Sequence, residues 1–82
     1  MNTAENTAVA FAEKIYAHMI TKMANEALAN YENRKQELTK LNAAIAAGEH
    51  TWQAPSSLVA EMSFFSGQIN AFKAVLAELQ NA

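Results

Sequence analysis

The segment LVAEMSFFSGQINAFKAVLAEL, residues 58–79, decides the fold of this chain. Its large apolar side chains recur at alternating steps of four and three residues, at Leu58, Met62, Phe65, Ile69, Phe72, Leu76 and Leu79. This unbroken heptad seam predicts a helix that packs along one line against another helix. We expect the helix to run from about residue 56 to 80, after Pro55 and with Ser56 or Ser57 as its cap. Gly67 lies inside it, off the seam, and close approach of another helix would explain a glycine there.

The preceding segment is much longer and predicts the partner helix. Residues 3–47 contain no proline or glycine, so we expect one helix over this range. Asn2 is the expected N-cap, with Glu5 completing a capping box, and Gly48 stands where a C-cap glycine belongs. Residues 48–55 are then the loop, and a loop this short predicts an antiparallel hairpin.

The apolar side chains of the long helix form a main stripe and a shorter second one. The main stripe is Ala8, Ala12, Ile15, Met19, Met23, Ala27, Tyr31, Arg34, Leu38, Leu41 and Ile45. A run of four-residue steps in its middle is a stutter, which turns the stripe around the helix. The second stripe is Val9, Tyr16, Ile20, Ala24 and Leu28, with Phe11 between the two. The N-terminal half is therefore apolar over a wide arc, as in a helix contacted from two directions.

Pairing the two seams predicts which residues meet in the hairpin. Setting Ile45 opposite Leu58 places Tyr31 opposite Phe72, and Leu79 then reaches Met23 or Ala24. At ~1.5 Å per residue, roughly 30 Å of the long helix extends beyond the short one. We expect self-association there, in a homodimeric four-helix, coiled-coil-like bundle, through Val9, Phe11, Ile15, Tyr16, Met19 and Ile20.

Composition limits the classes of protein that fit. With 82 residues, the chain has room for one domain, residues 1–82. There is no cysteine, which fits a cytoplasmic protein and excludes disulfides. The net charge is −2, and six cations are too few and too dispersed for a typical nucleic-acid surface. Charged residues interrupt every apolar stretch, so no membrane span is expected.

The chain carries no recognisable catalytic or metal-binding motif. Neither His18 nor His50 has a glutamate three residues before it, as di-metal helical bundles require. The glutamates are scattered away from the apolar seams, where burial could raise a carboxyl pKa for acid–base work. We therefore predict no catalytic residue, no metal, no cofactor and no enzymatic activity.

Four side chains are candidates for binding a partner protein: Trp52, Phe64, Val75 and Lys35. Trp52 is expected to fold onto the hairpin end near Ile45 and Leu58, although an exposed anchor for a partner is the alternative. Phe64, Ala71 and Val75 form a second stripe that serves either self-association or a target. Arg34, on the seam, either pairs with Glu37 or a residue of the second helix, or fixes register.

These patterns favour a small adaptor or inhibitor that acts through a helical surface. Proteins of this size that phages encode against host enzymes are an analogy for such a role. The alternative is a structural scaffold or assembly subunit that associates through the exposed stripe. A nucleic-acid-associated protein fits the charge less well.

Overall fold

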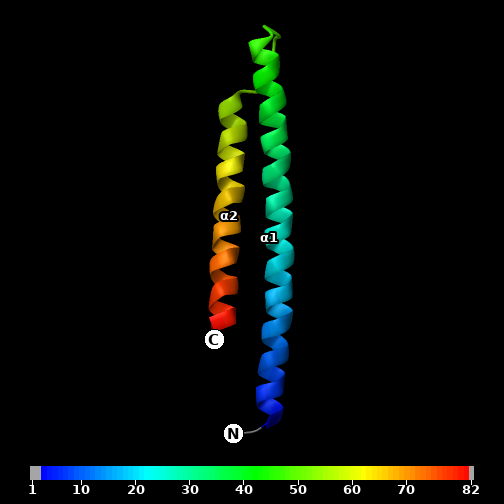
Figure 1. Cartoon of the computed structure of the whole chain (residues 1–82), viewed down its shortest axis with the longest axis vertical. Coiled ribbons are helices and arrows are strands. Elements are labelled where there is room, and N and C mark those ends of the chain that lie inside the picture. Colours follow the sequence, from blue (N-terminus) through cyan, green and yellow to red (C-terminus); the bar gives the residue numbers. More distant parts are fainter. Residues whose placement is uncertain (1–2, 82) are drawn as a thin grey trace.

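The computed structural model describes the backbone of residues 3–81 and the side chains of residues 6–81. It consists of two antiparallel helices, α1 (Thr3–Ala46) and α2 (Pro55–Asn81), joined by residues 47–54 (Figure 1). The hairpin is a rod of 70 × 14 × 14 Å. The predicted all-α hairpin of a long and a shorter helix is confirmed. No helix among the described residues has the length and apolar character needed to cross a bilayer.

Gly48 ends α1, as its position in the sequence predicts. Its φ angle is +79°, a left-handed conformation that glycine adopts at no steric cost. The Gly48 amide donates to the Ile45 carbonyl (3.0 Å), and the Glu49 amide donates to the Ala44 carbonyl (2.9 Å). These two bonds form a Schellman motif, which satisfies carbonyls that the end of the helix would otherwise leave unpaired.

α2 begins one residue earlier than predicted. Pro55 is its first residue, where the fixed φ angle and the missing N–H of proline suit a helix start. The Ser57 amide already donates to the Ala54 carbonyl (3.1 Å), so Ser56 and Ser57 lie in the first turn and do not cap it. The predicted capping box of Asn2 and Glu5 lies outside the residues whose side chains are described.

The seam of α2 is the predicted one, but the seam of α1 differs in its N-terminal half. The buried and half-buried side chains among the described residues of α1 are Ala17, Ile20, Ala24, Ala27, Tyr31, Arg34, Leu38, Leu41 and Ala44. Their steps of three and four are unbroken. Beyond Ala27 the contact follows Ala24, Ile20 and Ala17, so Met23 of the predicted stripe lies outside it. Ile15 and Met19, which were predicted to lie beyond the hairpin contact, are exposed.

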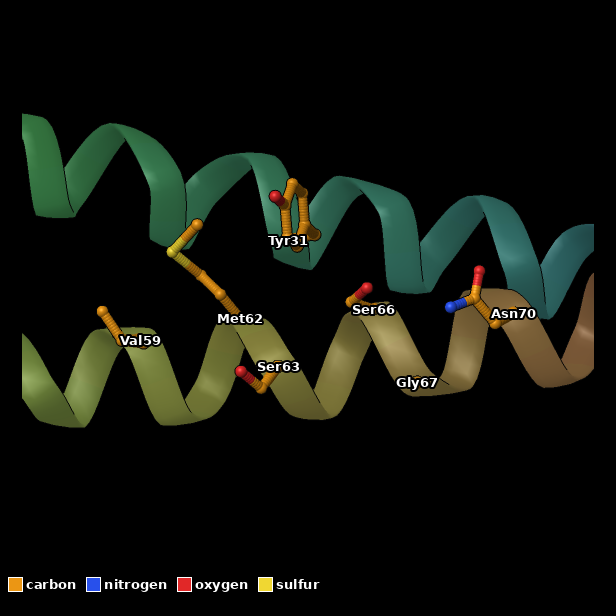
Figure 2. Close-up of a pocket in the computed structure, with 7 residues that line it drawn as sticks. All are labelled: Tyr31, Val59, Met62, Ser63, Ser66, Gly67 and Asn70. Atoms are coloured by element: carbon orange, nitrogen blue, oxygen red, sulfur yellow. The ribbon is translucent and has the colours of Figure 1, made fainter.

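The two helices are also paired in a different register. Arg34 contacts Glu61, and Tyr31 lines a cavity with Met62 and Ser66 (Figure 2), whereas the sequence placed Tyr31 opposite Phe72. At the other end, Leu79 lies beside Ala17 and not beside Met23 or Ala24. α2 is thus displaced by about one heptad toward the N-terminus of α1.

The displacement leaves α1 extending beyond α2 at both ends. Its last turns rise past the start of α2, and its first turns continue past the C-terminus of α2 (Figure 1). α2 ends beside the residues around Lys14, so the N-terminal extension measures roughly 15–20 Å and not the 30 Å expected. We call residues 3–13 the overhang.

Candidate interaction surface

The N-terminal half of α1 has an exposed apolar surface, as the sequence predicts for five of the six self-association residues. The exposed fractions are 56% for Val9, 64% for Phe11, 47% for Ile15, 48% for Tyr16 and 53% for Met19. Scattered apolar residues are normal on protein surfaces, but these lie within three turns of one helix. Exposed apolar side chains that gather over a wide arc of one helix indicate a contact site.

Ile20, the sixth predicted residue, does not belong to this surface. Only 7% of it is exposed, because it lies on the α1 seam against α2. The expectation that Ile20 lies uncovered is therefore wrong, because the side of α1 that packs against α2 runs through Ile20 and does not follow the predicted stripe. Ala17, Ile20 and Ala24 continue the heptad of Ala27 and Tyr31, so spacing alone places Ile20 on the side of α1 that faces α2. Its burial depends on the displaced register, which brings α2 along it.

Met23 belongs to the exposed surface, although the sequence placed it in the hairpin contact. It is 44% exposed and lines a shallow groove between α1 and α2, with Glu26, Ala27, Asn30, Gln68 and Phe72. Val9, Tyr16 and Met23 are seven residues apart and so share one side of α1. We call these three residues the α1 row. It starts on the overhang and leads into the groove.

The candidates on α2 and in the middle of α1 differ in accessibility. Phe64 is 61% exposed and packs edge-to-face on Phe65, with the ring centroids 5.4 Å apart. Lys35 is exposed, whereas Val75 is half-buried. Gln68 lies one helical turn from Phe64, so Phe64 stands next to the groove on the same side of the hairpin. The structure thus brings Phe64 and the α1 row to one face of the hairpin. Lys35 does not line the groove on that face.

Trp52 does not cover the end of the hairpin. Its exposed fraction is 95%, and its only described ring partner is His50, at a centroid distance of 5.0 Å and an interplanar angle of 85°. The predicted packing against Ile45 and Leu58 is wrong, because the displaced register carries the loop beyond the start of α2. Ile45 is consequently 44% exposed. This end of the rod therefore presents a second, smaller apolar surface.

Arg34 is the charged residue on the α1 seam, and it pairs as predicted. Its Nε lies 2.7 Å from Glu61 Oε2, and its Nη1 lies 3.6 Å from Glu37 Oε1. The side chains of Arg34 and Glu61 are 31% and 48% exposed, so solvent screens the pair. An ion pair of this kind contributes at most about 1 kcal/mol. Its geometric effect is to hold one particular turn of α2 beside Arg34.

The opposite side of the hairpin has a more polar depression. It is lined by Tyr31, Val59, Met62, Ser63, Ser66, Gly67 and Asn70 (Figure 2). A Cβ atom built on Gly67 would meet nothing within 4 Å. Within this chain, the close approach of another helix therefore does not explain Gly67.

The described ionisable groups are not gathered into a centre that could hold a metal. Within residues 6–81, no three His, Asp or Glu side chains are grouped for metal binding. His18 lies with Lys22, Asn25 and Glu26 along one exposed side of α1, and His50 lies in the loop against Trp52.

Comparison of the chain with protein-family models, with curated proteins and with solved structures finds no match.

Proposed function

We propose that this protein is a small protein-binding module, an adaptor or an inhibitor, that acts through its helical surface without chemistry of its own. The observation that carries the proposal is the concentration of exposed apolar side chains on the N-terminal half of α1. Burying a side chain of this size contributes roughly 1.5–3 kcal/mol, so a partner that covers several of them would bind stably. The absence of cysteine fits a cytoplasmic setting.

Self-association is part of the proposal. We propose that the chain is a homodimer and that the exposed side chains of the N-terminal half form its interface. A domain of this size gains little stability from its own core, and association with a second copy supplies more buried apolar surface. Sedimentation equilibrium at tens of micromolar is expected to give the mass of a dimer; a compact monomer would overturn this part.

The target protein is proposed to bind away from the self-association surface, through the exposed aromatic side chains Trp52 and Phe64. Large aromatic anchors that enter a partner's pocket supply much of the free energy of typical interfaces. The half-buried Val75 and the exposed Lys35 are proposed to contribute apolar contact and charge.

Affinity capture with quantitative mass spectrometry, from lysate of the organism that encodes the protein, tests the proposal. The wild-type chain is compared with Trp52→Ala and Phe64→Ala, and with Ser63→Ala as the matched control, since Ser63 lines the opposite depression. We expect proteins that the wild type and the control retain and at least one aromatic variant loses. If no protein shows this pattern, the adaptor or inhibitor proposal fails.

The second candidate is a scaffold or assembly subunit, which the exposed apolar side chains at both ends of the 70 Å rod favour. Contact between two different surfaces of successive copies would build an open filament, whereas a two-fold contact closes as a dimer. A sedimentation mass that keeps growing with protein concentration would support this alternative.

A nucleic-acid role is the third candidate function. We expect no mobility shift of DNA or RNA at about 150 mM salt, where non-specific binders still show Kd near 10⁻⁴–10⁻⁶ M.

A further inference from the structure

We infer that the hairpin has a second stable register, in which α2 packs one heptad further toward the C-terminus of α1, and that self-association draws the chain toward it. We call the pairing in the described structure the resting register and the second one the shifted register. The inference rests on the proposed self-association and adds to it a movement within each chain that connects the two ends of the rod.

The seam of α1 is longer than the seam of α2 by one heptad. The α2 seam has seven positions, from Leu58 to Leu79. The α1 seam has nine at alternating steps of three and four: Ala17, Ile20, Ala24, Ala27, Tyr31, Arg34, Leu38, Leu41 and Ile45. An antiparallel α2 matches these steps in two places, along residues 17–38 and along residues 24–45. The next position is Glu13 on one side and Gly48 on the other, a charge and the end of the helix, so the pattern offers no third place.

The described structure occupies the first of these two places. Leu79 lies beside Ala17, and the Nε of Arg34 lies 2.7 Å from Glu61 Oε2. Both contacts belong to the placement along residues 17–38. Ile45, the last position of the α1 seam, consequently extends past α2 and is 44% exposed.

The shift exchanges the cover of one isoleucine for that of another. Ile20 is 7% exposed in the resting register, whereas Ile45 is 44% exposed. Moving α2 by one heptad, about 10 Å, brings Leu58 to Ile45 and Leu79 to Ala24. Ile45 then becomes covered and Ile20 becomes bare. Because the two side chains are identical, the apolar area buried within the chain changes little.

Two further features make the shifted register accessible. Residues 47–54 run back past the last turns of α1 before α2 begins, so they also span the shorter path of the shifted register (Figure 1). Among the described residues, the ion pair between the helices joins Arg34 and Glu61, whose side chains are 31% and 48% exposed. Solvent screens this pair, so its loss costs little free energy. The pair makes the resting register the major one in an isolated copy.

Self-association favours the shifted register because this register releases Ile20. The bare Ile20 adds to the surface of Tyr16, Met19 and Met23, which are 44–53% exposed. A second copy that covers the N-terminal half of α1 therefore buries one more isoleucine in the shifted register. It binds that register more tightly, and the equilibrium moves toward it.

The same movement changes the loop end of the rod. Ile45 and Trp52 are the large exposed apolar side chains at that end, and the shifted register covers the first of them. A target protein that binds both side chains therefore holds α2 in the resting register. By linkage, it weakens self-association by the same factor by which self-association weakens its own binding.

Three cysteines in one chain measure the two registers against each other. The chain has no cysteine, so Ala17→Cys, Ala24→Cys and Leu79→Cys let position 79 form a disulfide with position 17 in the resting register or with position 24 in the shifted one. Brief oxidation, followed by peptide mapping, gives the ratio of the two bonds. We expect the bond 17–79 to predominate at about 1 μM and the share of the bond 24–79 to rise roughly threefold or more at about 100 μM.

His18→Cys combined with Leu79→Cys is the control. His18 lies with Lys22 and Asn25 on the outer side of α1, which neither register brings to α2. The yield of its disulfide measures linking through unfolding, and the bond 24–79 must exceed it. Mass spectrometry without reduction separates bonds within a chain from bonds between copies, and sedimentation of the same samples gives the mass of the assembly.

Chains locked in one register test the coupling from the other side. Oxidised Ala24→Cys/Leu79→Cys holds the shifted register, and oxidised Ala17→Cys/Leu79→Cys holds the resting one. We expect the dimer Kd of the first chain to be lower by about tenfold or more, because its interface buries one additional isoleucine. Reduction should bring both chains to nearly the same Kd, since they differ only in the position of one cysteine.

The outcomes separate this inference from the proposal beneath it. A share of the bond 24–79 that rises with concentration, together with tighter dimers of the chain locked in the shifted register, supports the inference. A dimer in which the bond 24–79 stays at the control level, or in which both locked chains associate equally, overturns the inference while self-association stands. A monomer at tens of micromolar overturns both.

Discussion

At the scale of single residues, the core of the hairpin is small and depends on few side chains. Leu58 has no exposed surface, Ala27 keeps 3% and Ile20 keeps 7%, while most other seam residues are only half-buried. Leu58 follows the first turn of α2 at the point where the chain returns to α1. Alanine substitutions at different seam residues should therefore lower the free energy of unfolding by different amounts.

Leu58→Ala is expected to lower the free energy of unfolding by about 3 kcal/mol, because it removes a fully buried side chain from a chain with little other core. Val59→Ala is the matched control: Val59 is 49% exposed and should lose less than about 1 kcal/mol. Urea denaturation, followed by circular dichroism at one protein concentration, gives both values. Equal losses for the two variants would contradict the described seam.

At the scale of elements, the seam allows more than one pairing of the helices. Two uninterrupted heptad patterns match again after a shift of seven residues, so apolar spacing alone does not choose between the two registers. The contact of Arg34 with Glu61 (2.7 Å) distinguishes them, because the shifted register separates these residues by about 10 Å. The pair adds little stability, but because it forms in one register and not in the other, we expect it to bias the choice.

Arg34→Leu is expected to weaken this selection. Two spin labels in one chain, at Lys40→Cys and Ser63→Cys, should give one narrow distance distribution when Arg34 is present. In the leucine variant the distribution should broaden or gain a second population shifted by about 10 Å, the length of one heptad. Dilution with unlabelled chain removes distances between copies. An unchanged distribution would show that the ion pair does not set the register.

The register also determines the environment of Trp52, the only tryptophan of the chain. Because its side chain is 95% exposed, its fluorescence maximum should lie close to that of the urea-unfolded protein, and acrylamide should quench it strongly. A blue-shifted, protected tryptophan would instead indicate the register that pairs Ile45 with Leu58. If a bound target protein then shifts the emission to the blue, Trp52 lies in that interface.

At the scale of the whole molecule, a thin rod has a large surface for its volume. The hairpin is 14 Å across in two directions, so each helix can bury only one side within the chain. Folding and association should therefore be coupled, as in other small helical chains that complete their core with a second copy.

The melting temperature should consequently rise with protein concentration. Met19→Lys, which places a charge in the proposed interface without touching the α1 seam, should lower the melting temperature and remove its dependence on concentration. Asn25→Lys, on the exposed side of α1 that His18 shares, is the control and should preserve both. A melting temperature that is constant between about 1 and 100 μM for the wild type would contradict the coupling.

Local signals in the sequence were enough to predict the two helices, the end of α1 at Gly48 and the hairpin. Glycine in a left-handed conformation at Gly48, proline at the first turn of α2 and the heptad of residues 58–79 act within a few residues. The exposed fractions of Val9, Phe11, Ile15, Tyr16 and Met19 also agree with the arc predicted from spacing. The register, and with it the burial of Ile20 and the exposure of Met23 and Trp52, became evident from the packed helices alone. A repeating seam gives nearly the same apolar contact at each heptad step, so the choice depends on contacts between residues far apart in the chain, such as Arg34 and Glu61.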